Sequence, residues 1–219
     1  MRLLASLAIV VCLFVLNVSP MSAASTASGA SQNAAQKKSR APEPVAIEDG
    51  TATLNPKNTS IQFIGTHVGP RPDPRVGYFT KFTGELAVDA ATKAPASAEL
   101  EIATASLVTP IAKLTNHLHT PDFFDVRQYP EATFKSTKIE TVDATRGKYK
   151  IIGELTIRDV KKPISFPATV RVSDAGILLA SKFKIKRSEF GMTFGPDRVE
   201  DVVTMTVTIG KPTPKVTPQ

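Results

Sequence analysis

One stretch of this 219-residue chain constrains the fold most strongly: HLHTPDFFDVRQYPEATF, residues 117–134. It lies between two segments in which apolar and polar residues alternate, but it has no such alternation itself. Two adjacent phenylalanines, Phe123 and Phe124, stand between Asp122 and Asp125 in what should be a loop. Loops usually carry polar side chains, because they run over the surface and their backbone needs water. Phe123 and Phe124 are therefore predicted to bury against the core, a partner or an apolar ligand.

The segments on both sides of this stretch alternate with a period of two. Near the C-terminus, for example, Val203, Met205 and Val207 alternate with threonines. Such alternation is typical of a strand with one dry face and one solvated face. Turn-forming clusters, such as Asp174-Ala175-Gly176, separate the segments. The sequence predicts about eight strands, at residues 60–67, 78–88, 98–102, 132–139, 148–158, 164–172, 177–186 and 199–209.

Strands with one dry face form either a closed barrel or a sandwich of two sheets. Several of the predicted strands reach about ten residues, or about 33 Å. Long strands curl into a barrel more easily, and closure removes the exposed edges. We therefore predict an all-β fold, an eight-stranded antiparallel β-barrel. The interior of such a barrel is either filled by side chains or holds one ligand.

One short helix is predicted at residues 110–118. Pro110 suits the first helical position, where its missing N–H is not needed. Ile111, Leu114 and Leu118 have the spacing of one helical face. Because the helix directly precedes the loop with the two phenylalanines, we expect the helix and this capping loop to cover one mouth of the barrel.

The N-terminus has the layout of a secretory signal: Arg2, then an apolar run, then small residues up to Ala24. The run is shorter than the ~20 apolar residues that a membrane span needs. We predict a signal peptide over residues 1–24, cleaved near Ala23 or Ala24, with an uncleaved anchor as the alternative. Cleavage would place the protein in the bacterial periplasm or outside the cell. Cys12 would leave with the signal, so the mature chain would have no disulfide and no cysteine ligand.

Two segments that flank the predicted barrel are poor in large apolar residues. Residues 25–51 are rich in Ala, Ser, Gln, Lys and Pro, which predicts a disordered linker. Residues 211–219 alternate Pro with Thr and Lys, which predicts an extended, disordered tail. Residues 52–210 then form one domain with one core.

The chain carries a net charge of +7, which becomes +6 when the signal and its single charged residue, Arg2, are removed. Lysines and arginines are spread along the sequence. Lys182, Lys184 and Lys186 alternate with apolar residues, as expected for the solvent face of a strand. An anionic membrane surface or an acidic ligand headgroup is the alternative partner for such a face. Nucleic acid is disfavoured, because the chain is predicted to be exported and has no Trp for base stacking.

Enzyme motifs are absent from the sequence. It has no GxSxG elbow, no P-loop and no glycine-rich dinucleotide turn. His117, His119 and Asp122 could hold a metal, since His and carboxylate are usual zinc ligands. However, the sequence has no HExxH motif to support such a site. We predict no catalytic residues, no metal and no enzymatic activity, and a metal-dependent enzyme at these three residues is the weakest alternative.

The predicted dry faces carry large apolar side chains. Any one of them more often fills a core than contacts a ligand. Together they could bury an apolar tail, and each buried methylene contributes ~0.8 kcal/mol, so that a dozen carbons give on the order of 10 kcal/mol before the costs of binding. These residues are Phe63, Phe82, Leu100, Phe134, Leu155, Phe166, Phe183 and Met205.

The stretch at residues 117–136 has the pattern HLxxxDFFDVxxYPxATFxS, which resembles the signature of the YceI-like family. Four other segments resemble elements of that family in the same order, at residues 53–67, 77–84, 153–164 and 187–192. The resemblance covers residues 52–210. One departure is the loop at residues 69–75, which is longer and richer in proline than the short turn of the family.

The family consists of lipocalin-like proteins that bind polyisoprenoids in the bacterial periplasm. The resemblance implies a lipocalin-like barrel that binds, sequesters or transports a long-chain isoprenoid, an isoprenoid quinone or a similar amphiphilic lipid by burial, with no other cofactor. The lipid would contact the eight residues above together with His117, Phe123 and Phe124. Its headgroup is expected at the barrel mouth, near His117, Asp122, Arg187 or Arg198.

Other readings stay open at this point. The main alternative is a barrel with a filled interior, which acts as an envelope stress or interaction protein through its mouth loops at residues 110–130. Contact with a membrane surface and a homodimer are also left open. The sequence does not fix the chain length or the headgroup of the lipid.

Overall fold

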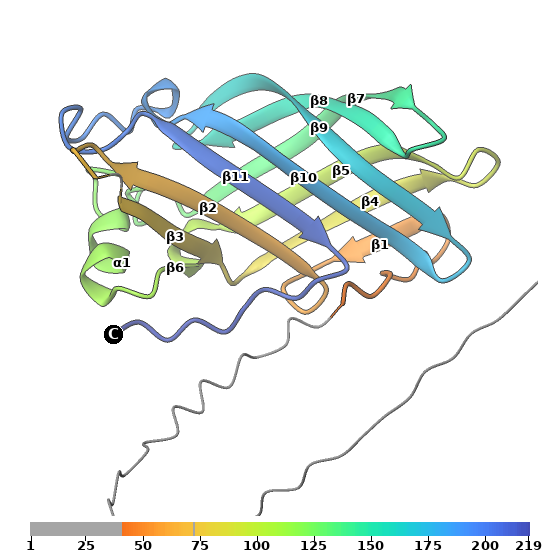
Figure 1. Ribbon diagram of the computed structural model, residues 1–219, viewed down its shortest axis with the longest axis horizontal. Helices are drawn as coiled ribbons and strands as arrows, with labels where there is room; N and C mark the ends of the chain where they lie inside the picture. The colour runs from red at the N-terminus through yellow and green to blue at the C-terminus, as the bar shows by residue number, and fades with distance from the viewer. Residues whose placement is uncertain (1–40, 72) are drawn as a thin grey trace, which may run out of the picture. The chain divides into compact units, whose positions relative to one another are not determined.

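The computed structural model describes residues 41–71 and 73–219, which form one antiparallel sheet with one α-helix (Figure 1). The predicted signal peptide at 1–24 and the linker residues 25–40 lie outside the described residues. The helix is α1 (Ala112–Leu118). The strands are β1 (Thr51–Leu54), β2 (Thr59–His67), β3 (Asp73–Phe79), β4 (Phe82–Asp89), β5 (Ala94–Ala103), β6 (Leu107–Val108), β7 (Glu131–Asp143), β8 (Lys148–Ile157), β9 (Val160–Ser173), β10 (Gly176–Lys186) and β11 (Val202–Ile209).

The sheet curls into a barrel, because the chain links strands near one end of the strand order directly to strands near the other end. The order is β1-β4-β5-β7-β8-β9-β10-β11-β2-β3-β6. β4 continues β3 after Thr80 and Lys81, and β6 continues β5 after a 3-10 turn, Thr104–Ser106. Two backbone hydrogen bonds of 3.1 Å hold this corner, from Thr80 N–H to Ser106 O and from Ala103 N–H to Lys81 O. The last strands of the order are therefore joined to the first ones by the chain itself.

The prediction of an all-β antiparallel barrel is confirmed, and its strand count is corrected to eleven for the residues that the structure describes. Every predicted segment overlaps one or two of the observed strands. Three passes of the chain are broken by bends, at residues 55–58, 80–81 and 104–106. At the first bend, the Asn55 N–H donates to Asn58 Oδ1 at 3.0 Å. The buried positions change phase at the bends, as at residues 80–81, where Phe79 and Phe82 are both buried at an odd spacing. The prediction carried a single phase through residues 78–88 and therefore missed that bend.

The predicted helix is present, but it begins at Ala112, two residues later than expected. Ile111 is its N-cap and has an extended backbone, with φ −111° and ψ 110°, so Pro110 precedes the helix. Leu118 is buried and Leu114 packs against the core, whereas Ile111 is exposed. Within the described ranges, no helix has the length and apolar character needed to cross a bilayer.

The segment before β1 is held against the barrel, which corrects the linker prediction for residues 41–51. Val45 is buried and pairs with Ile177 of β10 in an isolated antiparallel bridge. Its N–H donates to Ile177 O at 2.9 Å, and the Ile177 N–H donates back to Val45 O at 2.8 Å. β11 pairs with β10 only from Leu179 onward, so Ile177 has backbone groups on that side of β10 that need partners. The linker supplies these partners, and its polar composition did not indicate this.

The C-terminal tail, residues 211–219, is extended as predicted but is hydrogen-bonded to the barrel rather than disordered. The Thr213 N–H donates to Pro56 O at 2.9 Å, and the Gln219 N–H donates to Pro110 O at 2.9 Å. Figure 1 shows the tail running below β2 and β3 toward α1. The tail therefore joins the two ends of the barrel on the outside.

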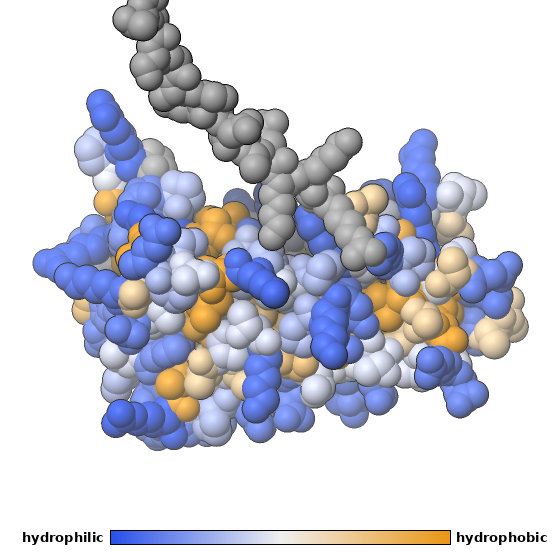
Figure 2. Space-filling view, turned by 90° about the horizontal axis from the view of Figure 1, so that it is seen from below, coloured by the Kyte–Doolittle hydropathy of each residue, from blue (hydrophilic) through white to orange (hydrophobic). Residues whose placement is uncertain are grey.

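Apolar side chains inside the barrel form two clusters. One lies at the end that α1 covers and includes Phe79, Leu118 and Phe190. The other lies toward β1 and includes Leu54 and Leu86. The side of the molecule seen in Figure 2 is largely hydrophilic, with hydrophobic residues in several separate places.

Candidate ligand-binding cavity

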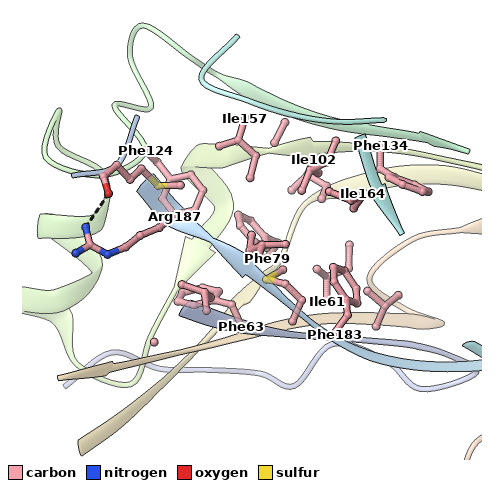
Figure 3. Close-up of a pocket in the computed structure, with 18 of the residues that line it drawn as sticks. Ile61, Phe63, Phe79, Ile102, Phe124, Phe134, Ile157, Ile164, Phe183 and Arg187 are labelled. Carbon is pink, nitrogen blue, oxygen red and sulfur yellow. Dashed lines mark hydrogen bonds between the residues drawn. The ribbon is translucent and has the colours of Figure 1, made fainter. Parts of the chain in front are cut away.

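The barrel encloses a cavity of about 410 Å³, a size typical of small-molecule sites. Its walls are inward-facing side chains of the strands, and apolar residues dominate them (Figure 3). The cavity reaches the surface at His67 and Arg198, which are exposed and define its mouth. Its floor is formed by residues that are almost fully buried: Leu54, Leu86, Ile151, Leu179 and Ile209. The cavity therefore has one open end with charged residues and one closed apolar end.

Inward side chains of β11 form part of the cavity wall. β11 pairs with β10 on one side and with β2 on the other, so its inward side chains can be covered only from inside the barrel. Val203, Met205 and Val207 line the cavity and are only partly buried, as is Ile164 on β9. Ile61, on the neighbouring strand, is 2% exposed. The partly buried residues and the buried Ile61 thus lie in the same wall.

The loop with the two phenylalanines folds over one side of the mouth. The Phe124 N–H donates to Leu118 O at 3.1 Å, which turns the chain back after α1. Phe123 is buried, with its ring centroid 5.5 Å from that of Phe194. Phe124 meets Phe79 edge to face at 5.9 Å. Both phenylalanines line the cavity, so they bury against the protein's own core and cavity wall.

A second loop, residues 187–201, covers the other side of the mouth and is held together by Arg187. This side chain is 4% exposed. It donates from Nε to Glu200 O at 3.1 Å, from Nη1 to Met192 O at 2.7 Å and from Nη2 to Val199 O at 2.9 Å. Figure 3 shows Arg187 at the same end of the cavity as Phe124. Burial lowers the pKa of Arg187, but an arginine stays charged because its ordinary pKa is far above neutral.

Asp201 anchors the start of the same loop. Its carboxylate accepts hydrogen bonds of 2.9 Å from both the N–H and the hydroxyl of Ser188. Burial raises the pKa of Asp201, but the Ser188 hydrogen bonds and the Arg187 charge together hold it below its ordinary value. Because the folded pKa is depressed, the stabilisation is present above the ordinary pKa of Asp. It is lost as the pH falls through the folded value.

Replacing Asp201 by alanine is expected to lower the free energy of unfolding by about 1 kcal/mol at neutral pH, the typical value of a hydrogen-bonded group. The difference from the unmodified protein should vanish in strong acid, where Asp201 is protonated in both states. Urea unfolding at a series of pH values would measure it. Asp197→Ala, at an exposed position of the same loop, is the control and should show no such trend. A difference that is constant with pH would contradict the role given to the ionised carboxylate.

The histidines that could have formed a metal site point to different partners. His117 Nε2 lies 2.8 Å from Asp122 Oδ2, whereas His119 Nε2 lies 3.0 Å from the backbone oxygen of Leu107. In residues 41–71 and 73–219, no cluster of three or more His, Cys, Asp or Glu is arranged to hold a metal ion. His117 instead lies between two rings of the mouth, with centroid distances of 5.0 Å to Phe123 and 4.8 Å to Phe194.

Ten of the eleven residues predicted to contact a ligand line the cavity, and Phe82 does not. Phe82 is 3% exposed and is the first residue of β4 after the bend at 80–81. Its core cluster also holds Phe79, Ile102 and Leu107, so its ring fills the core. Contact of the other ten with a ligand stays a prediction. They are Phe63, Leu100, His117, Phe123, Phe124, Phe134, Leu155, Phe166, Phe183 and Met205.

Several residues of the cavity wall were not singled out by the sequence analysis. Ile61 and Ile164 lie at inward positions of predicted strands, and the alternation placed them on the dry face without separating wall from core. Phe194 lies in the second mouth loop and reaches the rings of the first loop. Nothing in its local sequence signals that contact, because the two loops are far apart along the chain.

The curled antiparallel sheet surrounds an apolar cavity that is open at one end. This arrangement places the protein in the class of small β-barrels with an internal pocket. A family model described as the YceI-like domain matches residues 53–210. The chain therefore belongs to the YceI-like family, as its sequence motifs indicated.

Curated relatives and solved structures agree with this assignment. A UPF0312 protein of Shewanella denitrificans is 30% identical over 163 residues, covering 70% of this chain and 83% of that protein. A UPF0312 protein of Vibrio parahaemolyticus is 38% identical over 111 residues, covering 51% of this chain and 57% of that protein. The chain thus spans little more than half the length of the first curated relatives that it matches.

Among solved structures, BcnA of Burkholderia cenocepacia is similar, with 27% identity and a TM-score of 0.62, covering 69% of this chain and 94% of that one. A polyisoprenoid binding domain from Saccharophagus degradans has a TM-score of 0.56 over 73% of this chain and 96% of that one. At 16% identity, this second likeness is one of fold.

Proposed function

We propose that this protein binds a long-chain isoprenoid or a similar amphiphilic lipid by burial, without catalysis. The observation that carries the proposal is the one-ended cavity, whose floor and walls are apolar and whose charged residues lie at the mouth. Such a cavity suits a ligand with one polar end and one long apolar chain. About a dozen buried methylenes would contribute on the order of 10 kcal/mol before the costs of binding.

The family relationship supports the same ligand class. The solved domain from Saccharophagus degradans is described as polyisoprenoid-binding, and its fold is similar to that of this chain. The predicted export signal at residues 1–24 adds a location, so we infer that the protein carries or sequesters the lipid in the periplasm. Contact with a membrane surface and a homodimer stay predictions. The filled-barrel alternative is not favoured, because the barrel holds a cavity of about 410 Å³.

Organic extraction of the protein purified from a bacterial periplasm, followed by mass spectrometry, tests this function. We expect a stoichiometric isoprenoid, isoprenoid quinone or other long-chain amphiphile in the extract. If the protein is empty as isolated, titration of delipidated protein with an isoprenoid quinone replaces the extraction. A protein that is empty and also fails to take up the added quinone would contradict the proposal and favour a role through the mouth loops.

A further inference from the structure

The ionisable side chains that line the cavity are all basic. They are His67, Arg75, His117, Arg187 and Arg198, and no Asp or Glu is found among the described residues of the wall. Because lining charges of one sign attract the opposite charge, this asymmetry bears on the chemistry of the ligand headgroup.

Three of these basic groups already have carboxylate partners outside the cavity wall. Arg75 forms an ion pair with Asp73, and His67 Nδ1 lies 3.7 Å from the same carboxylate. His117 contacts Asp122. These groups contribute little net charge to the mouth, so the remaining two arginines decide its character.

Arg187 and Arg198 keep donor capacity that the protein does not use. A guanidinium has five N–H donors, and Arg187 gives three of them to the carbonyl oxygens of its own loop. Arg198 is held at the mouth by its backbone, since its carbonyl accepts the Val68 N–H at 2.9 Å. In the described part of the chain, its exposed guanidinium makes no hydrogen bond or ion pair.

A hydrogen bond links Arg187 to the residue next to Arg198. Arg187 Nη2 bonds to the carbonyl oxygen of Val199, the residue directly after Arg198. The acidic residues of this loop do not line the cavity, and Asp201 is occupied by Ser188. The mouth therefore has two guanidinium groups in its wall, the buried one of Arg187 and the exposed, unpartnered one of Arg198.

We propose that the mouth binds an anionic head, so that the cargo is a single-chain lipid that ends in a phosphate or a carboxylate rather than in an alcohol. This inference rests on the proposed lipid-binding function. The guanidinium fork matches the paired oxygens of both anions, and charge-assisted hydrogen bonds to them are about twice as strong as neutral ones. The chain lies toward the apolar floor, and the head stays between Arg187 and Arg198.

Geranylgeranyl phosphate and geranylgeraniol have the same isoprenoid chain and differ only in the headgroup. Calorimetric titration of the delipidated full-length protein with each of them therefore measures the effect of the headgroup charge on affinity. We expect the phosphate to bind at least about tenfold more tightly, or about 1.4 kcal/mol, with a margin that shrinks as salt is added. Palmitate against hexadecanol repeats the comparison for a carboxylate and shows which anion is preferred. Equal affinities within both pairs would overturn the anionic-head proposal and leave lipid binding intact. No binding of any of the four lipids would overturn both proposals.

Titrating the variant Arg198→Gln, with Arg127→Gln as the matched control, tests whether the preference for an anionic head arises at the mouth. Both positions are exposed and both variants remove one positive charge, but Arg127 lies in the capping loop and does not line the cavity. We expect Arg198→Gln to weaken geranylgeranyl phosphate about tenfold and to leave geranylgeraniol unchanged, whereas Arg127→Gln changes neither. The same loss in both variants would mean that only the overall charge matters, and this would overturn the site.

Discussion

Replacing Arg187 by methionine is expected to lower the free energy of unfolding by about 3 kcal/mol or more, because each backbone oxygen that loses its donor costs about 1–3 kcal/mol. Arg187 is 4% exposed and is the donor to three backbone oxygens of the second mouth loop. Methionine fills a similar volume but donates nothing, so these oxygens lose their partners in a place with little access to water. Urea unfolding at neutral pH would measure the loss.

Two further variants make this prediction specific. Arg187→Lys keeps the charge but lacks the planar fork, so an intermediate loss is expected. Arg171→Met removes an exposed arginine from β9 and should change the stability by less than about 0.5 kcal/mol. If Arg187→Met were as stable as Arg171→Met, the second mouth loop would be held by other contacts, and Arg187 would have no structural role.

Replacing Ile164 by tryptophan is expected to weaken lipid binding by more than about tenfold, or about 1.4 kcal/mol, with a change in stability below about 1.5 kcal/mol, the limit for a tolerated core exchange. Ile164 points into the cavity (Figure 3) and is only partly buried. The larger ring can therefore occupy space that the fold leaves free, and it takes that space from the lipid. Titration with geranylgeraniol and urea unfolding measure the two effects on the same protein.

Ile177→Trp is the matched control for overpacking. Ile177 is 0% exposed on the neighbouring strand and does not line the cavity. Extra volume there must displace neighbours, which typically costs about 1–3 kcal/mol. If Ile164→Trp destabilised the protein as much as Ile177→Trp does, the interior would be filled in solution. The filled-barrel reading would then replace the carrier.

The position of Phe82 in the structure decides which substitution can distinguish a lipid carrier from a filled barrel. The sequence placed Phe82 on the ligand face, where a charge would mainly reduce lipid binding. Since Phe82 is 3% exposed inside the core, Phe82→Glu would destabilise either kind of barrel and would not distinguish them. Ile164, on a free stretch of wall, is the informative position.

The sequence by itself determined the strands, their inward faces and the burial of Phe123 and Phe124. These are local properties: alternation of period two sets the face of each side chain, and two adjacent phenylalanines in a loop must find cover. The family signature added the family, which the match over residues 53–210 confirmed. Ten of the eleven proposed contact residues followed from the same inward direction and from the capping loop.

Only the tertiary structure decided whether inward side chains meet one another or leave a space. Phe82 and Phe183 both face inward, but the first meets the residues around the β3–β4 bend and the second faces the cavity. The role of Arg187 depends on carbonyl oxygens that lie five to thirteen residues further along the chain. The pairing of Val45 with Ile177 joins segments that are far apart in sequence. Such contacts depend on the curvature of the whole sheet and on the bends that close it, and no local pattern of residue types records either.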